Sequence, residues 1–355
     1  MPDTNSGPER PDADLIRALE ESNVHPLWDR YAKVIPVRPS APDTPMLWRW
    51  RDIEPLAARA ATEVPLDDKE RRALIMAHPA FGGDTVATSN LIGAFTILEP
   101  GDRAPMHRHT APAIRFGVDS DGAATIVNGR RCNMGKGDLV LTPPMCWHGH
   151  INGSGKPTVW FDALGSLISN HLDASFFEPG AENPEIWSVD DGDERLWAAA
   201  GMVDPAAARG PAASGEPSVA GDPAHSPKFH YPGDQARRLL AAMAPGPDGA
   251  RTMRYVDPVT GGSVMHMLDC YMTRLDTDAP TRPRRATYNA VCLVTEGRGR
   301  SDIGGQTIEW SERDIFTIPH WEWARHEAIG GDADIFIVTD RVVYERLGIL
   351  REEME

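Results

Sequence analysis

Short apolar segments separated by turn sequences occur twice along this chain of 355 residues. They lie at 73–76, 91–98, 114–118, 124–127, 139–142 and 158–163, and again at 265–275, 290–295, 306–310, 314–318 and 335–339. Asp121-Gly122 and Asn128-Gly129 are strong signals for hairpin turns. Many short strands joined by tight turns are typical of antiparallel barrels and jelly rolls. The sequence therefore predicts an all-β dominated fold.

The two halves also share motifs at corresponding places. The matches are Ala104-Pro105 with Ala279-Pro280, Asn128-Gly129 with Gly304-Gly305, 137–143 with 313–319, and Trp147-His-Gly-His150 with Trp323-Ala-Arg-His326. Self-similarity at this spacing indicates that one β-barrel has been duplicated within the chain.

The predicted organisation has four parts. Residues 1–50 form an N-terminal arm and helix, with a flexible arm to residue 12, an amphipathic helix over 12–33 and a proline-rich connector after it. Residues 51–180 form the first barrel, and the aromatic segment 46–51 packs on the core. A linker follows at 181–250, with a stretch rich in Pro, Gly, Ala and Ser at 203–228 and a short helix at 235–243. Residues 251–355 form the second barrel.

His107, His109 and His148 are the best candidates for a metal site. Side chains two residues apart on a β-strand point to the same side, so His107 and His109 can face one cavity. His148 follows a later apolar segment and can supply the third imidazole. Three imidazoles hold a divalent transition metal and leave positions free for substrate and oxygen, which is typical of a catalytic site. Zinc and manganese fit this donor set as well as iron.

The second half has lost these ligands. The sequence Arg-Pro-Arg-Arg at 282–285 stands where the first half has His107 and His109, and Ala324 stands where the first half has His148. The sequence therefore predicts one metal per chain, in the first barrel, with the second barrel as a structural partner.

Composition narrows the range of partners and compartments. A formal net charge of −16 argues against a nucleic-acid partner, because phosphate binding needs clustered Lys and Arg. No run approaches the roughly 18 apolar residues that a membrane span needs, and the first ten residues do not resemble a secretion signal. Four scattered cysteines without a C-x-x-C pair favour a reducing, cytoplasmic setting.

The histidines and their surroundings resemble the cupin superfamily. The first cupin motif is met at Gly101, His107 and His109 but lacks its Glu, and the second is met at Gly137, Pro143, His148 and Asn152. His-Arg-His-Thr, then Arg-Phe, Val-x-Gly-x-Arg, Met-x-x-Gly-Asp, Thr-Pro, Trp-His-x-His and Trp-x-Asp, is similar to the gentisate 1,2-dioxygenase family. That family includes salicylate and 1-hydroxy-2-naphthoate dioxygenases, and the resemblance covers nearly the whole chain.

The resemblance implies a fold and an activity. The fold is a bicupin, two jelly-roll β-barrels with N-terminal and inter-barrel helices. The activity is Fe(II)-dependent opening of a 2-hydroxybenzoate by dioxygen, between the carbons that bear the carboxyl and hydroxyl groups. His107, His109 and His148 are then the iron ligands, and the chain forms a homo-oligomer, a tetramer in this family.

Several substrates and functions stay open at this point. Gentisate is one candidate, and salicylate, its 5-nitro, 5-amino and 5-halo derivatives and 1-hydroxy-2-naphthoate are the others. Other classes are a metal-dependent isomerase or hydrolase and a ligand-binding cupin without iron.

Three polar residues are predicted to serve catalysis. Arg115 lies six residues after His109, an even offset that faces the same cavity if the strand is unbroken, and its guanidinium can hold a carboxylate. His150 follows His148 by two and can move a proton. Asp162 can orient a histidine. The alternatives are an exterior ion pair for Arg115 and a surface position for Asp162.

The remaining predictions concern substrate binding. Of the neighbours Arg71 and Arg72 only one can face inward, and the family pattern favours Arg71. Trp147 is expected to form a packing wall of the pocket. Ile92, Ala94 and Thr96 share one strand face and are predicted to line it. Some salicylate-cleaving relatives carry a larger aromatic residue in place of Ile92 and Gly in place of Ala94, which leaves the ring substituent open.

Overall fold

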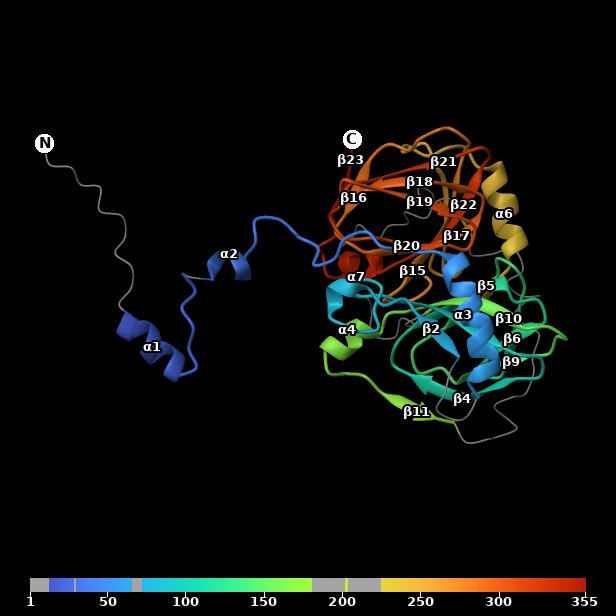
Figure 1. Cartoon of the computed structure of the whole chain (residues 1–355), viewed down its shortest axis with the longest axis horizontal. Coiled ribbons are helices and arrows are strands. Elements are labelled where there is room, and N and C mark those ends of the chain that lie inside the picture. The colour runs from blue at the N-terminus through green and yellow to red at the C-terminus, as the bar shows by residue number, and fades with distance from the viewer. Residues whose placement is uncertain (1–12, 29, 66–71, 181–201, 204–224) are drawn as a thin grey trace, which may run out of the picture. The chain divides into compact units, whose positions relative to one another are not determined.

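A computed structural model describes residues 13–28, 30–65, 72–180, 202–203 and 225–355. The chain divides into two compact units, 1–40 and 41–355, which are coloured along the chain in Figure 1. Among the described residues, no helix is long and apolar enough to cross a membrane.

The first unit contains two short helices, α1 (Ala13–Glu21) and α2 (Tyr31–Val34). The prediction of one helix over 12–33 is therefore wrong. Asn23 adopts a left-handed φ of 56° just after α1, and Pro26 has no N–H to continue a helical ladder. The predicted arm 1–12 lies outside the described residues.

The first barrel consists of two facing sheets. The six-stranded sheet has the order β13-β8-β5-β10-β3-β2, with β2 (Ala73–Ile75), β3 (Ile92–Leu98), β5 (Ala113–Asp119), β8 (Leu139–Thr142), β10 (Thr158–Leu164) and β13 (His230–Tyr231). The five-stranded sheet has the order β11-β4-β9-β6-β7, with β4 (Arg103–His109), β6 (Ala123–Val127), β7 (Arg130–Met134), β9 (His148–Asn152) and β11 (Phe177–Pro179).

The second barrel repeats this arrangement. Its seven-stranded sheet has the order β1-β20-β17-β22-β15-β14-β12, with β1 (Leu47–Trp48), β12 (Met202–Val203), β14 (Arg251–Tyr255), β15 (Asp269–Leu275), β17 (Ala290–Glu296), β20 (Ile315–Ile318) and β22 (Ala333–Thr339). Its five-stranded sheet has the order β19-β18-β21-β16-β23, with β16 (Arg284–Ala286), β18 (Arg298–Ile303), β19 (Gln306–Ser311), β21 (Ala324–Ala328) and β23 (Glu352–Met354). The predicted all-β pair of barrels is confirmed.

The two large sheets pack face to face between the barrels. Alternation along each strand sends one set of side chains into its own barrel and the other set into this shared layer. Phe116 of β5 stacks on Phe336 of β22 with ring centroids 4.0 Å apart, and both belong to one continuous apolar core. Trp160 and Trp310 instead belong to the separate interiors of the first and second barrel.

Strand register repeats between the barrels at the positions that matter for the site. His107 pairs with His148 across β4 and β9, and Arg284 pairs with Ala324 across β16 and β21. In the same way, Thr125 lies opposite His150 in the first barrel, and Ser301 lies opposite His326 in the second. These registers agree with the duplication that the sequence motifs indicate.

Helices occupy the outside of the barrels. The predicted helix at 235–243 is confirmed as α6 (Gly233–Ala242), whereas α3 (Trp50–Glu63) was not predicted. Helix α3 buries Ala57 and Ala61 against Ile97 of β3, and Trp50 packs edge-on against Phe95 of the core, as expected for segment 46–51. The other short helices of the described residues 41–355 are η1 (Pro79–Phe81), α4 (Ser166–His171) and α7 (Arg341–Arg346).

The four-part division of the chain stays a prediction. Strand pairing joins residues across two of its boundaries. Strand β1, from the predicted arm, pairs with β20 of the second barrel, and β13, from the predicted linker, pairs with β8 of the first. Most of the segment 203–228 lies outside the described residues.

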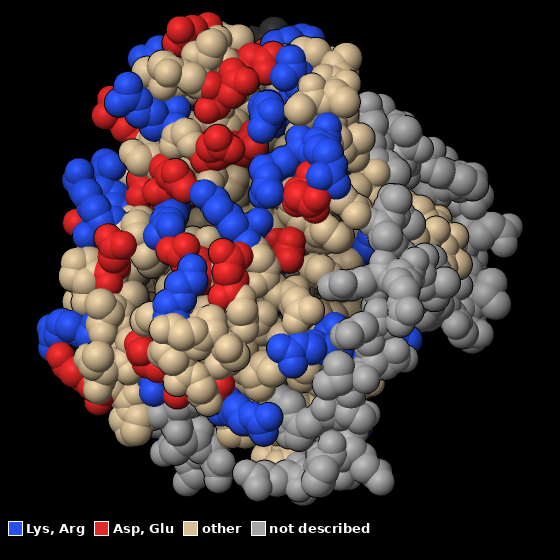
Figure 2. All heavy atoms as spheres, turned by 90° about the vertical axis from the view of Figure 1, so that its right-hand side faces the viewer, with Lys and Arg blue, Asp and Glu red and all other residues tan. Residues whose placement is uncertain are grey.

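The surface turned toward the viewer in Figure 2 mixes both signs of charge. Lys and Arg side chains alternate there with Asp and Glu over most of the described surface. A nucleic-acid groove needs a continuous basic stripe, and the described residues on this face do not form one.

Candidate metal centre

The three predicted histidines lie together between the sheets of the first barrel. Their ligand atoms are all within 4.8 Å of one another. The ring centroid of His148 is 4.2 Å from that of His107 and 4.9 Å from that of His109. Strand β4 supplies two of the rings because they are two residues apart, and the neighbouring strand β9 supplies the third.

Backbone carbonyls hold each ring by the same nitrogen. Nδ1 lies 3.1 Å from the Pro105 carbonyl oxygen in His107, 2.7 Å from that of Ala111 in His109, and 2.9 Å from that of Cys146 in His148. A carbonyl can only accept, so each Nδ1 carries the proton and each Nε2 keeps its lone pair. This tautomer is the one that a metal ligand needs.

The Nε2 atom of His148 is buried and has no hydrogen-bond partner among the described residues. Burial, followed by the proximity of His107 and Arg115, lowers the pKa of His148 well below its ordinary value. A buried basic nitrogen without a partner is costly, and a metal ion would satisfy it. The donor set therefore fits a divalent transition metal with three neutral nitrogen ligands.

Arg115 faces the histidines from the opposite sheet. The condition of one unbroken strand from His109 to Arg115 is not met, because β4 ends at His109 and β5 starts at Ala113. Arg115 nevertheless lies inside the barrel, where its guanidinium is buried and is 2.8 Å from Asp162 of the neighbouring strand β10. It also donates to the Thr142 hydroxyl at 3.1 Å. The predicted cavity position is reached across the barrel and not along one strand.

Asp162 is buried with Arg115 and is not a surface residue. Its carboxylate also accepts hydrogen bonds from the Thr96 hydroxyl and from Trp160 Nε1. Burial raises the pKa of Asp162 against the opposing effect of Arg115. These contacts make Asp162 a support for Arg115, and the predicted contact with a histidine stays a prediction.

His150, on β9, lies beside the cluster of three histidines. Its ring centroid is 6.0 Å from that of His148 and 5.3 Å from that of Trp160. Its Nδ1 is 2.9 Å from the Thr125 hydroxyl on β6. Sequence reasoning missed Thr125, Thr142 and Trp160, although a polar Thr within each apolar strand marks a buried hydrogen bond.

The face of β3 that carries Ala94 and Thr96 also belongs to this interior. Ala94 lies opposite Asp162 in the strand pairing, and Ile92 lies opposite Leu164. Ala94 is buried and Ile92 is half-buried. That Ile92, Ala94 and Thr96 line a substrate pocket stays a prediction.

Of the adjacent arginines, only Arg72 is described, and it lies away from the site. Arg72 forms an ion pair with Asp102, and its Nε donates to the Val64 carbonyl at 2.7 Å. These contacts agree with the prediction that Arg72 faces away. Arg71 lies outside the described residues.

Trp147 lies on the other side of strand β4. Its ring packs against the guanidinium of Arg108, with 4.7 Å between the guanidinium carbon and the ring centroid. Arg108 stands between His107 and His109 and so points to the opposite face. The structure corrects the expectation that Trp147 is a wall of the pocket, because its ring packs on Arg108, on the face of β4 opposite to His107 and His109.

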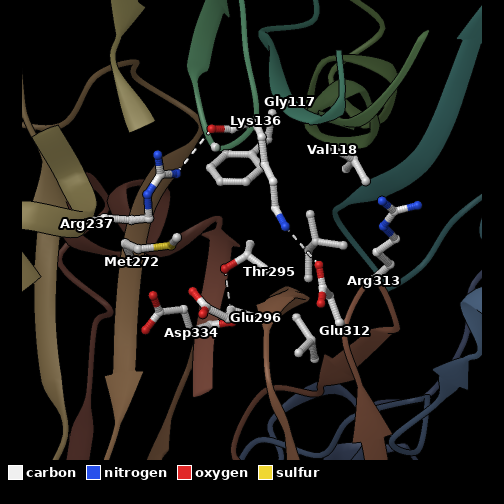
Figure 3. A pocket seen from close by; sticks show the side chains of 14 residues that line it. Gly117, Val118, Lys136, Arg237, Met272, Thr295, Glu296, Glu312, Arg313 and Asp334 are labelled. Atoms are coloured by element: carbon white, nitrogen blue, oxygen red, sulfur yellow. Dashed lines mark hydrogen bonds and ion pairs between the residues drawn. The ribbon is translucent and has the colours of Figure 1, made fainter. Parts of the chain in front are cut away.

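A separate groove lies at the junction of the barrels (Figure 3). Two ion pairs involve its lining residues, Lys136 with Glu312 at 2.9 Å and Arg313 with Asp119 at 2.9 Å. None of the predicted site residues lines it. The metal centre is therefore distinct from this groove.

Comparison with known proteins relates the chain to several enzymes. The cupin domain family matches residues 94–164. The chain is 33% identical over 338 residues to a gentisate 1,2 dioxygenase 1 of Aquipseudomonas alcaligenes, covering 94% of each. It is 32% identical to a 5-aminosalicylate 1,2-dioxygenase of Comamonas sp, covering 96% of this chain and 89% of the relative. The crystal structure of salicylate 1,2-dioxygenase from Pseudoaminobacter salicylatoxidans with gentisate has a TM-score of 0.86, with 30% identity and coverage of 98% and 96%.

Proposed function

The chain belongs to the gentisate and salicylate 1,2-dioxygenase family of ring-cleaving cupin enzymes, and on that premise we propose that it opens a 2-hydroxybenzoate by iron-dependent dioxygenation. The substrate is gentisate or a related substituted salicylate, cleaved between the carbons that bear the carboxyl and hydroxyl groups. The observation that carries the proposal is a cluster of three imidazoles, with His107 and His148 buried and His109 half-buried, that faces a buried arginine in one barrel.

His107, His109 and His148 are the proposed iron ligands. Iron(II) held by three neutral imidazoles keeps its dipositive charge and supplies the electron transfer that dioxygen needs in order to react with an aromatic ring. The carbonyl-anchored tautomers support this assignment, because all three Nε2 atoms keep a lone pair.

Arg115 is proposed to bind the substrate carboxylate. The carboxylate of Asp162 forms an ion pair with its guanidinium, 2.8 Å from Nε, and one terminal nitrogen donates to the Thr142 hydroxyl. Because Asp162 and Thr142 already hold the guanidinium in place, Arg115 does not have to rearrange when a carboxylate binds, which favours binding. Arg71 is proposed as a second contact for that carboxylate, on the family pattern alone.

His150 is proposed to take the proton from the substrate hydroxyl. Thr125 holds Nδ1 of the imidazole at 2.9 Å, which directs Nε2 toward proton exchange. An imidazole titrates near neutral pH and suits this role. Ile92, Ala94 and Thr96 are proposed to line the space for the ring, with Ala94 and Ile92 deciding which ring substituents fit.

The proposal extends to assembly and compartment. A homo-oligomer, a tetramer on the family pattern, is proposed from the resemblance. All four cysteines are free and buried, which supports a cytoplasmic enzyme.

The decisive experiment loads the protein with Fe(II) under anaerobic conditions and then admits oxygen. It compares gentisate, salicylate, 5-aminosalicylate, 5-nitrosalicylate and 1-hydroxy-2-naphthoate by kcat/KM, because one pocket contact changes discrimination by about 1–3 kcal/mol. We expect one oxygen consumed per ring opened with at least one of these acids. Turnover without oxygen, or no oxygen uptake with the whole panel, would contradict the proposal.

His148→Ala gives the matching test of the metal site. We expect iron retention to fall from about one per chain to background and turnover to be lost, because two imidazoles alone hold iron weakly. His326→Ala removes an imidazole from the second barrel and should leave the iron content unchanged. Metal analysis after gel filtration measures both.

A further inference from the structure

The second barrel carries a guanidinium where the first carries a metal ligand. Arg284 pairs with Ala324 in the register that joins His107 to His148 in the first barrel. Ala324 belongs to the apolar interior of the second barrel, so its strand partner Arg284 points toward that interior. The next residue, Arg285, points outward, where it stacks on Trp323 and pairs with Glu353.

The C-terminal strand β23 places a carboxylate beside this guanidinium. Glu352 Oε1 lies 3.5 Å from Arg284 Nη2 and accepts a hydrogen bond from the Tyr288 hydroxyl at 3.1 Å. Arg341 approaches the same carboxylate through Nε at 3.4 Å and Nη2 at 3.3 Å. Two cations and one hydroxyl therefore converge on a single carboxylate.

Each arginine divides its donors between Glu352 and a fixed neighbour. Arg341 uses Nη1 for Glu345 at 2.9 Å, and Nη1 of Arg284 lies 3.6 Å from Asp248. The donors that face Glu352 are thus separate from those that face Glu345 and Asp248, and Nη2 of Arg284 also donates to the Tyr288 hydroxyl at 3.1 Å. Removal of the Glu352 side chain would take this acceptor from Arg341 and Tyr288 and would leave Nη2 of Arg284 with the Tyr288 hydroxyl alone.

We propose that the second barrel contains a carboxylate-binding pocket formed by Arg284, Arg341 and Tyr288, and that Glu352 from the chain's own C-terminal strand occupies it. The ligand class is a small monocarboxylate. A permanent guanidinium charge takes the place of the metal charge of the first barrel, and a tethered carboxylate takes the place of an incoming anion.

The electrostatics and the exposure agree with this assignment. Burial alone raises the pKa of Glu352, but Arg341 and Arg284 outweigh it and the pKa lies below its ordinary value. The side chains of Arg284 and Glu352 are 42% and 35% exposed. An external carboxylate can therefore reach the pocket once Glu352 is removed.

Rescue by acetate tests the pocket in the full-length protein. Glu352→Ala should lower the melting temperature, and acetate should restore it along a saturable curve in the millimolar range. Acetamide, which has the same shape without the charge, should not. Glu353→Ala is the matched control, since it removes the neighbouring carboxylate that pairs with Arg285 on the outer face, and acetate should not restore it.

Chemical modification gives a second readout. Phenylglyoxal followed by peptide mapping should label Arg284 at least severalfold faster in Glu352→Ala than in the wild type, and acetate should slow that labelling. If Glu352→Ala does not fold, Glu352→Gln should show the same increase, because the amide removes the charge that screens Arg284. Equal labelling of Arg284 in the variants and the wild type, or equal rescue of both alanine variants by acetate, overturns the proposal. Neither readout depends on ring cleavage.

Discussion

Arg115 and Asp162 form a buried ion pair in which each side chain compensates the charge of the other. The pair is buried, and its members are adjacent on β5 and β10. Sequence reasoning could pick out both residues but treated Asp162 as a partner of a histidine. The strand pairing that joins them is a long-range property, so their contact became clear only in the fold.

Asp162→Ala should therefore destabilise the protein strongly. Removing one partner of a buried pair leaves the other charge uncompensated, which costs about 3–5 kcal/mol. Glu178→Ala breaks the more exposed pair with Arg108, and we expect about 1 kcal/mol or less. Urea denaturation of both variants measures the difference, and equal losses would argue against a buried ionic pair.

The half-buried imidazole of His326 predicts a pH dependence of stability. Burial, followed by the charge of Arg284, lowers its pKa from 6.5 to about 4. Between those values the unfolded chain binds the proton and the folded one does not. Stability is thus fully present above pH 6.5 and falls as the pH drops toward 4, by roughly 3 kcal/mol in total. His326→Gln should remove this part of the slope, and parallel curves for the two proteins would contradict the prediction.

At the scale of elements, local sequence fails where the stabilising contact is distant. Helix α3 has no side-chain cap of its own at Arg49, and its first N–H is accepted by Asp314 of the second barrel at 2.8 Å. Strand β18 buries Gly299 and Ser301, which are too small and polar to signal a core-facing strand. Both elements escaped prediction for these reasons.

The β-bulge in β5 predicts that Gly117 in this strand does not tolerate a larger side chain. Strand β10 shifts its register against β5 between Val159 and Trp160, so that Trp160 lies opposite Gly117. A Cβ on Gly117 would collide with the Gly135 carbonyl and the Ser120 hydroxyl. Gly117→Ala should destabilise the protein by about 1–3 kcal/mol or more, because overpacking forces the backbone to move.

Gly155 is the matched control for that substitution. Nothing lies within 4 Å of the position its Cβ would take, so Gly155→Ala should leave the midpoint of chemical denaturation nearly unchanged. Similar losses of stability in the two variants would show that crowding at Gly117 does not cause the destabilisation.

At the scale of the whole molecule, the two barrels share one apolar layer. The stacked pair Phe116 and Phe336 joins β5 to β22 within a continuous core. Because neither barrel covers its large sheet alone, we expect the two to unfold together.

Phe336→Ala should therefore weaken both barrels. The substitution should cost about 3–5 kcal/mol and should lower the temperature of metal release from the first barrel together with that of global unfolding. Phe316 is buried inside the second barrel alone, and Phe316→Ala should lower the midpoint of the same single unfolding transition. Two calorimetric transitions, only one of which shifts, would contradict this expectation.

The sequence by itself determined the two-barrel fold, the family and the three histidines of the candidate metal site. These rest on local periodicity, on turn residues and on spacings of two residues along a strand, all of which are fixed before the chain folds. Only the tertiary structure decided that Arg115 reaches the site across the barrel, that Trp147 points away from it, and that Arg284 holds Glu352 in the second barrel. Those outcomes depend on which strands pair and in what register, and pairing is set by contacts between residues far apart in the chain.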